Sequence, residues 1–145
     1  MLDILRGSSY VAVCVLLLSV PARADAPAGR YMAGNGTVLD TKTGLTWEQP
    51  ASTTNVVWSA AKSYCTGKGT GWRLPTIKEL LSIVDFGKTT SPKIDSMFAG
   101  TVSNTYWSST PLADALDTFY AVNFVNGGIN TGEGAVVAIP VRCVR

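Results

Sequence analysis

GWRLPTIKEL, residues 71–80, contains a complete set of residues for starting a helix. The Thr76 hydroxyl is placed to accept a hydrogen bond from the backbone of Glu79, and the Glu79 side chain is placed to reach back, as in a capping box. Pro75 favours an extended entry. Apolar residues then recur at helical spacing to about Asp85, which predicts a short helix with one buried face. They are Ile77, Leu80, Leu81 and Val84.

Another helix is predicted just before this stretch, from Val56 to about Thr66. Trp58, Ala61 and Cys65 fall at positions i, i+3 and i+7, so they share one face. Asn55 is placed to cap the first turn. A glycine-rich turn ends the helix.

The first 24 residues are expected to be a cleaved secretory signal peptide. Arg6 precedes a largely apolar run at 11–20, and the small-x-small pattern of a cleavage site, Ala22-Arg23-Ala24, follows. The run is about half as long as a membrane-spanning helix requires, so we expect no permanent membrane anchor. Cys14 lies inside the run and is expected to be removed with it. These features predict a secreted or periplasmic protein.

Two cysteines, Cys65 and Cys143, remain after cleavage, in 121 residues that suffice for one hydrophobic core. An exported protein can keep a disulfide, and two cysteines allow only one. The bridge would close a loop of 78 residues, for which chain entropy gives about 4–5 kcal/mol. The alternative is a pair of unrelated buried thiols.

A β-hairpin is predicted near the start of the mature chain. Two short alternating runs, 37–40 and 45–48, flank the turn 41–44, which ends in a glycine. Trp47 is a core candidate. Residues 25–35 are rich in small residues and are expected to form a flexible lead-in.

A long loop and then β-structure are predicted for the rest of the chain. Residues 86–105 contain glycine, proline and several hydroxyl side chains, and long loops often carry binding functions. Ile94, Met97 and Phe98 are expected to pin this loop to the core. Strands are predicted at 106–110, 118–125 and 136–144. Pro140 lacks a backbone donor, so the last strand needs an edge or a non-bonded position there.

The composition argues against several function classes. The chain contains no histidine, which is the commonest general base near neutral pH, so a serine or cysteine nucleophile would lack its usual partner. The net charge of +2 falls to +1 without Asp3, Arg6 and Arg23, and no run of like charges occurs. We therefore expect neither catalysis nor a nucleic-acid partner.

Several short motifs, taken in order, resemble one known family. They are Gly36-Thr37-Val38-Leu39-Asp40, Thr43-Gly44-Leu45-Thr46-Trp47, Trp72-Arg73-Leu74-Pro75-Thr76, Tyr106-Trp107-Ser108-Ser109 and Val141-Arg142-Cys143-Val144-Arg145. The ordered set resembles the DUF1566 domain, also called the Lcl C-terminal domain, over residues 36–145. The middle block is also similar to formylglycine-generating enzymes and their relatives, which share a C-type-lectin-like architecture.

The resemblance implies an α+β, C-type-lectin-like domain at 36–145. Such a domain has two helices flanking a twisted, mostly antiparallel sheet, and a disulfide commonly ties its first helix to its last strand. Cys65 and Cys143 fit those positions. The resemblance also implies a role in binding or adhesion, because the domain that gives the family its name serves adhesion to host polysaccharides.

Two motifs allow both a functional and a structural role. Arg73 and Glu79 form either a charged pair in an active cleft or part of the helix start, and the capping box favours the structural role. Tyr106-Trp107-Ser108-Ser109 lies where calcium-dependent lectins carry Trp-Asn-Asp. Calcium prefers carboxylate and carbonyl oxygens to hydroxyls, so we expect no metal site of that kind.

Ligand-binding residues are expected in two C-terminal loops, where polar side chains lie beside glycines. They are Asp114, Asp117, Asn126, Asn130 and Glu133. Asp114 and Asp117 either bind a metal or are solvated loop carboxylates, and the second is favoured because aspartates are usually exposed.

The sequence thus predicts a secreted, non-catalytic binding or adhesion module for a glycan or a cell-surface protein, with no cofactor. Two alternatives stay open. One is an enzyme on the scaffold of formylglycine-generating enzymes, which would need a reactive cysteine pair. The other is a structural subunit of an envelope complex.

Overall fold

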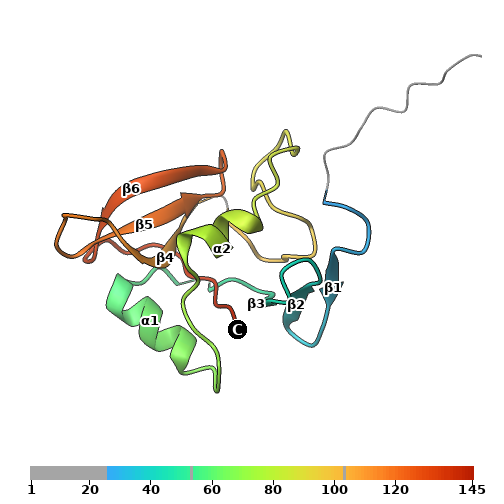
Figure 1. Ribbon diagram of the computed structural model, residues 1–145, viewed down its shortest axis with the longest axis horizontal. Helices are drawn as coiled ribbons and strands as arrows, with labels where there is room; N and C mark the ends of the chain where they lie inside the picture. The colour runs from blue at the N-terminus through green and yellow to red at the C-terminus, as the bar shows by residue number, and fades with distance from the viewer. Residues whose placement is uncertain (1–25, 53, 103) are drawn as a thin grey trace, which may run out of the picture.

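The computed structural model describes residues 26–52, 54–102 and 104–145, which form an α+β arrangement of two helices and two small sheets (Figure 1). The predicted signal peptide at 1–24 lies outside the described residues. The elements are β1 (Tyr31–Ala33), β2 (Thr37–Asp40), β3 (Thr46–Glu48), α1 (Trp58–Thr66), α2 (Ile77–Ser82), β4 (Thr105–Pro111), β5 (Thr118–Asn123) and β6 (Gly128–Gly134). Two three-stranded sheets replace the single sheet that was expected.

The first sheet contains the predicted hairpin and one further strand. β2 pairs antiparallel with β3, so that Val38 lies opposite Trp47, and both side chains are buried. β1 pairs with β2 on the other edge, where Tyr31 lies opposite Asp40. Residues 31–33 of the expected lead-in at 25–35 thus form a strand, and burial of the Tyr31 ring holds β1 in place.

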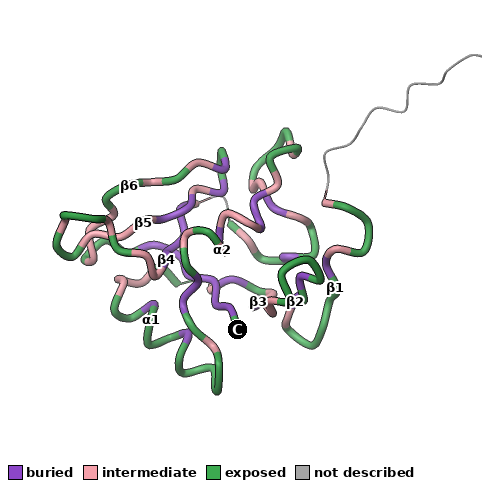
Figure 2. The backbone as a smooth tube through the Cα atoms, in the orientation of Figure 1, coloured by how far each residue is buried: buried purple, intermediate pink, exposed green. Residues whose placement is uncertain are grey.

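The second sheet has the order β4-β5-β6 and is antiparallel throughout. Trp107 of β4 lies opposite Ala121 of β5, and both are fully buried. Figure 2 shows buried residues along β4 and the C-terminal segment. Trp107 and Ala121 of this sheet belong to a core shared with α1. Tyr106 and Val122, on the same two strands, belong to another core, shared with the first sheet, α2 and the long loop.

The predicted strand at 136–144 is not a continuous strand. Val144 makes isolated bridges to Trp47 and Arg73, and Ile139 makes one to Val56. Pro140 has no N–H to donate, and its carbonyl instead accepts from Trp107. The segment thus crosses the middle of the molecule and bonds to several elements in turn.

Both helices start close to their predicted positions. The end of α2 and the cap of α1 differ from the prediction. Thr76 caps α2 with a complete capping box, as predicted. α2 ends at Ser82, because Val84 leaves the helix to bridge with Ile94 of the long loop. For α1 the capping residue is Val57 and no side chain caps it, so the prediction for Asn55 was wrong.

The long loop between α2 and β4 is held by apolar side chains. Ile94 and Phe98 are each only 2% exposed, as predicted for residues that pin the loop. The ring of Phe98 contacts the Tyr31 ring edge-on, with centroids 4.9 Å apart. Met97 is 38% exposed, so its predicted role in pinning the loop was wrong.

Cys65 and Cys143 form the predicted disulfide, with their Cα atoms 5.3 Å apart and a sequence separation of 78 positions. Both residues are fully buried in the core that contains Ala61, Trp107 and Val141. The bond therefore joins the last turn of α1 to the C-terminal segment.

Replacing both bridge cysteines (Cys65→Ser with Cys143→Ser) should lower the free energy of unfolding by about 2–5 kcal/mol, because the unfolded chain regains the entropy of a large loop. Urea denaturation followed by tryptophan fluorescence measures the change. Ser63→Ala, on the exposed side of α1, is the matched control and should stay within about 0.5 kcal/mol of the original. An equally stable double serine variant would contradict the structural role of the bond.

Candidate functional site

The five residues predicted to bind ligand do not form one site. Asn126 lies in the turn between β5 and β6, where its Oδ1 accepts from the backbone of Gly128 at 2.8 Å. Asp117 lies at the opposite end of the same hairpin, where its carbonyl accepts from Ala135 at 2.7 Å. Because an antiparallel hairpin separates its turn from its open end, Asn126 and Asp117 cannot contact the same small ligand.

The structure brings Asn130 and Glu133 together, but their side chains hydrogen-bond to each other. The Asn130 amide donates to Glu133 Oε1 at 3.0 Å and to the Thr105 hydroxyl at 3.3 Å. The bond to Thr105 ties β6 to the start of β4, and the bond to Glu133 lies within β6. Asp114 and Asp117 remain exposed, with φ of 62° and 51°, a backbone conformation that aspartate tolerates better than most residues.

A cleft of about 370 Å³ lies between α1, the segment that leads into α2, and β4. We call it the Trp58 cleft. Its lining residues are Trp58, Lys62, Thr66, Arg73, Leu74, Thr76 and Ser109. The Trp58 cleft is thus lined by an aromatic ring, an aliphatic side chain, two cations and three hydroxyls.

Trp58 is held rigidly in this cleft. Its ring stacks on Phe119 with centroids 3.8 Å apart and an interplanar angle of 9°. Its Nε1 donates to the Ser108 carbonyl at 2.9 Å, and its backbone N–H donates to Ala135 at 3.1 Å. The indole is therefore fixed by β4, β5 and the residue after β6.

Arg73 is the cation of the cleft that already has a carboxylate partner. Its guanidinium donates twice to Glu79, at 2.8 and 2.6 Å, and Glu79 also accepts from the backbone of Thr76 at 2.8 Å. The Arg73 bonds, together with those from Thr76, hold the pKa of the Glu79 carboxyl below its usual range despite partial burial. The pair therefore positions Arg73 at the cleft, and Glu79 also serves the capping box.

Lys62 is the cation of the cleft that no carboxylate neutralises. Its Nζ lies 5.6 Å from the centroid of the Trp58 ring, one helical turn before it in α1. Among the described residues, the ion pairs are Arg30–Asp40, Lys68–Glu48 and Arg73–Glu79, and none involves Lys62. The ammonium is exposed, so it is available to an anionic group entering the cleft.

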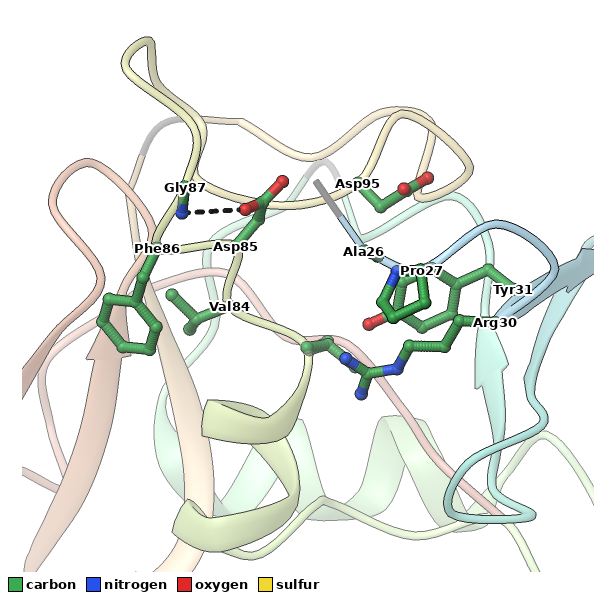
Figure 3. A pocket seen from close by; sticks show the side chains of 10 residues that line it. Ala26, Pro27, Arg30, Tyr31, Val84, Asp85, Phe86, Gly87 and Asp95 are labelled. Atoms are coloured by element: carbon green, nitrogen blue, oxygen red, sulfur yellow. Dashed lines mark hydrogen bonds between the residues drawn. The ribbon is translucent and has the colours of Figure 1, made fainter. Parts of the chain in front are cut away.

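A second cleft of about 250 Å³ lies beside Tyr31, between the end of α2 and the chain before β1 (Figure 3). The carboxylates that line it already accept hydrogen bonds from the backbone. Asp85 accepts from the backbone of Gly87, as Figure 3 shows, and Asp95 accepts from that of Met97. Burial raises the pKa of Tyr31 to about 12, so its hydroxyl stays protonated at neutral pH.

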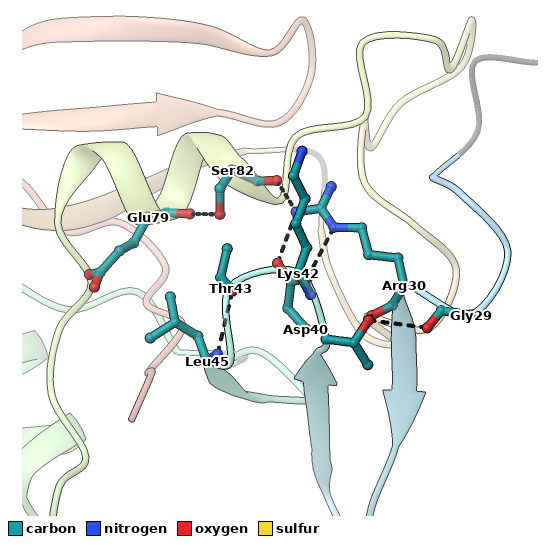
Figure 4. Close-up of polar contacts among 9 residues, drawn as sticks. Gly29, Arg30, Asp40, Lys42, Thr43, Leu45, Glu79 and Ser82 are labelled. Atoms are coloured by element: carbon teal, nitrogen blue, oxygen red, sulfur yellow. Dashed lines mark hydrogen bonds and ion pairs between the residues drawn. The ribbon is translucent and has the colours of Figure 1, made fainter.

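Arg30, which also lines this second cleft, joins the first sheet to α2. It donates to both carboxylate oxygens of Asp40, at 3.1 and 2.9 Å, and to the Ser82 carbonyl at 2.7 Å (Figure 4). Removal of Arg30 would leave the fully buried Asp40 carboxylate without its cation. The second cleft is therefore lined by groups with structural partners, unlike Lys62 in the Trp58 cleft.

Neither a metal cluster nor a membrane helix appears in the part of the chain that the structure describes. No group of three or more His, Cys, Asp or Glu residues in these ranges is arranged to hold a metal ion. Within the same ranges, no helix combines the length and apolarity needed to cross a membrane.

The sequence interpretation missed Lys62 and assigned Trp58 only to the core. The two residues are four apart on a predicted helix, so their contact was predictable. The approach of Ser109 and Arg73 to them was not, because these residues come from elements distant in sequence.

Glu79→Gln should lower the free energy of unfolding by about 1 kcal/mol or less at pH 7, since the Arg73 pair is partly exposed. Because folding lowers the pKa of Glu79, this contribution is complete above the unfolded pKa of about 4.3. It is lost as the pH falls through the folded pKa. Urea denaturation at pH 7 and pH 3 should therefore show a smaller difference between the two proteins at pH 3.

Lys78→Gln, in the same helix, is the matched control, because Lys78 is exposed and takes part in none of the ion pairs of the described residues. Its effect on the unfolding free energy should be equal at both pH values. An effect of Glu79→Gln that is also equal at both would contradict the role of the carboxylate charge.

Comparison with known proteins places the chain in a family. Among curated proteins, none matches it. The crystal structure of botrocetin is similar with a TM-score of 0.48 and 12% sequence identity, over 83% of this chain and 98% of that one. The Lcl C-terminal domain matches residues 36–145. The chain therefore belongs to the Lcl C-terminal domain family, as its ordered motifs predicted.

Proposed function

We propose that this protein is a non-catalytic module that binds a glycan outside the cytoplasm, and that the Trp58 cleft is its binding site. The combination of one fixed aromatic ring with several hydroxyls and one unpaired cation carries the proposal. Sugars present apolar C–H faces and many hydroxyls, so they suit a site of that composition. The family supports a binding role, since its founding domain serves adhesion.

The unpaired Lys62 favours a sugar with one carboxylate per residue. Arg73 is already neutralised by Glu79, so an entering ligand meets about one net positive charge. A single carboxylate matches that charge and accepts a charge-assisted hydrogen bond from an ammonium. A densely sulfated chain would require a larger basic cluster.

The disulfide supports both the location and the lack of catalysis. Disulfides persist mainly in oxidising compartments, which agrees with an exported protein. Because Cys65 and Cys143 are joined, they offer no thiolate for the chemistry of a cysteine enzyme. We further propose a C-type-lectin-like architecture, supported by a bond between the first helix and the C-terminal segment.

Trigalacturonic acid should bind the purified protein, and Lys62→Ala should weaken that binding about ten-fold, as expected for loss of one charge-assisted hydrogen bond. Isothermal titration calorimetry measures both affinities. The methyl ester of the same trisaccharide is the matched ligand, and it should bind the original protein and Lys62→Ala equally.

Lys78→Ala is the matched protein control, because Lys78 is exposed on α2 and does not line the cleft. It should bind the acid as the original protein does. If neither the acid, its ester nor a neutral oligosaccharide binds, the proposed function is wrong. If the acid and the ester bind equally well, the role of Lys62 is wrong.

A further inference from the structure

Two of the most exposed apolar side chains in the described residues lie on segments that are joined by a backbone hydrogen bond. Leu116, in the loop between β4 and β5, is 96% exposed, and Val136, after β6, is 86% exposed. The Asp117 carbonyl accepts from the backbone of Ala135 at 2.7 Å, which brings the two segments together. With Val137, which is 40% exposed, they form what we call the apolar knob.

Carboxylates accompany the apolar knob. Asp114 and Asp117 flank Leu116 in the same loop and are exposed. In the described part of the chain, neither takes part in an ion pair. Single exposed apolar residues are ordinary on protein surfaces, but adjacent ones with a charged rim are typical of an interaction site.

The Trp58 cleft has the complementary chemistry and lies beside the apolar knob. Ala135, which bonds to Asp117, also accepts from the backbone of Trp58 at 3.1 Å. The cleft has apolar walls at Trp58 and Leu74, an unpaired ammonium at Lys62, and about 370 Å³ of space, which exceeds the volume of a leucine side chain. One surface thus carries an acidic apolar projection next to a basic, partly apolar hollow.

We propose that two copies of this protein associate about a two-fold axis, with the apolar knob of each copy seated in the Trp58 cleft of the other. A self-complementary surface of this kind closes into a dimer, because each contact is made twice. Leu116 fills the cleft, and Asp117 of one copy faces Lys62 of the other. The dimer covers the glycan site of the proposed function, so dimerisation and glycan binding compete for Lys62.

Sedimentation velocity of the purified protein without any glycan tests the proposal. The original protein should dimerise with a dissociation constant below about 1 mM. Leu116→Ser should weaken the dimer at least about ten-fold, because it removes the side chain that fills the cleft. Lys62→Glu should do the same, because it sets like charges opposite each other.

Exchanging the charges of Lys62 and Asp117 distinguishes a specific contact between these residues from a general effect of net charge. Asp117→Lys should also weaken the dimer about ten-fold, and Lys62→Glu combined with Asp117→Lys should return it to within about three-fold of the original. Lys78→Glu is the control and should have no effect. Lysine is less tolerant than aspartate of a φ of 51°. Asp117→Asn therefore provides a second variant, which keeps the conformation and should weaken the dimer several-fold.

Three results would overturn the proposal. They are a protein that stays monomeric up to about 1 mM, a dimer that Leu116→Ser leaves unchanged, and an exchanged double variant that dimerises no better than either single variant. Urea unfolding of each variant shows that it is folded. Because Leu116 and Lys62 are exposed, their replacement should leave the unfolding free energy within about 0.5 kcal/mol.

Discussion

The bond between Cys65 and Cys143, together with the Glu48 carboxylate beside it, holds the C-terminal segment at the centre of the molecule. Glu48 is only 4% exposed and accepts from the backbone of Cys143, from the Tyr64 hydroxyl and from the Lys68 ammonium. β3, α1 and the C-terminal segment therefore meet at one place. Since α1 forms a wall of the Trp58 cleft, the shape of that cleft depends on this junction.

The residue before Cys143 extends the junction to the long loop. The Arg142 guanidinium is buried and donates to the carbonyls of Glu48 and Gln49 and to the Thr101 hydroxyl. It also lies 5.2 Å from the centroid of the Phe98 ring. Burial lowers the pKa of Arg142 to about 10, so it remains charged near neutral pH. The buried Arg142 cation thus holds the loop against β3 through hydrogen bonds to carbonyl and hydroxyl oxygens and through its contact with the Phe98 ring. It does so without an ion pair to a carboxylate.

Which cations can bind a partner at the surface depends on which of them already have a carboxylate partner within the fold. Arg30, Lys68 and Arg73 are paired with carboxylates inside the fold or at its edge. Lys62 is not, and it borders the cleft that contains the rigid Trp58 ring. An uncommitted cation therefore distinguishes this cleft from the hollow beside Tyr31. A glycan carboxylate and the acidic rim of a second copy would both meet that cation.

Local patterns in the sequence determined the hairpin at β2 and β3, the capping box at Thr76 and the two helices, because neighbouring residues make the interactions that form these elements. Resemblance to a family supplied the pairing of the two cysteines. Tertiary contacts decided the rest. Val84 lies outside α2 and pairs with the long loop, and the C-terminal segment bridges to β3 and to the two segments that precede α1 and α2 instead of forming a strand. The Trp58 cleft combines α1, the entry to α2 and β4, so no local pattern could place its residues together.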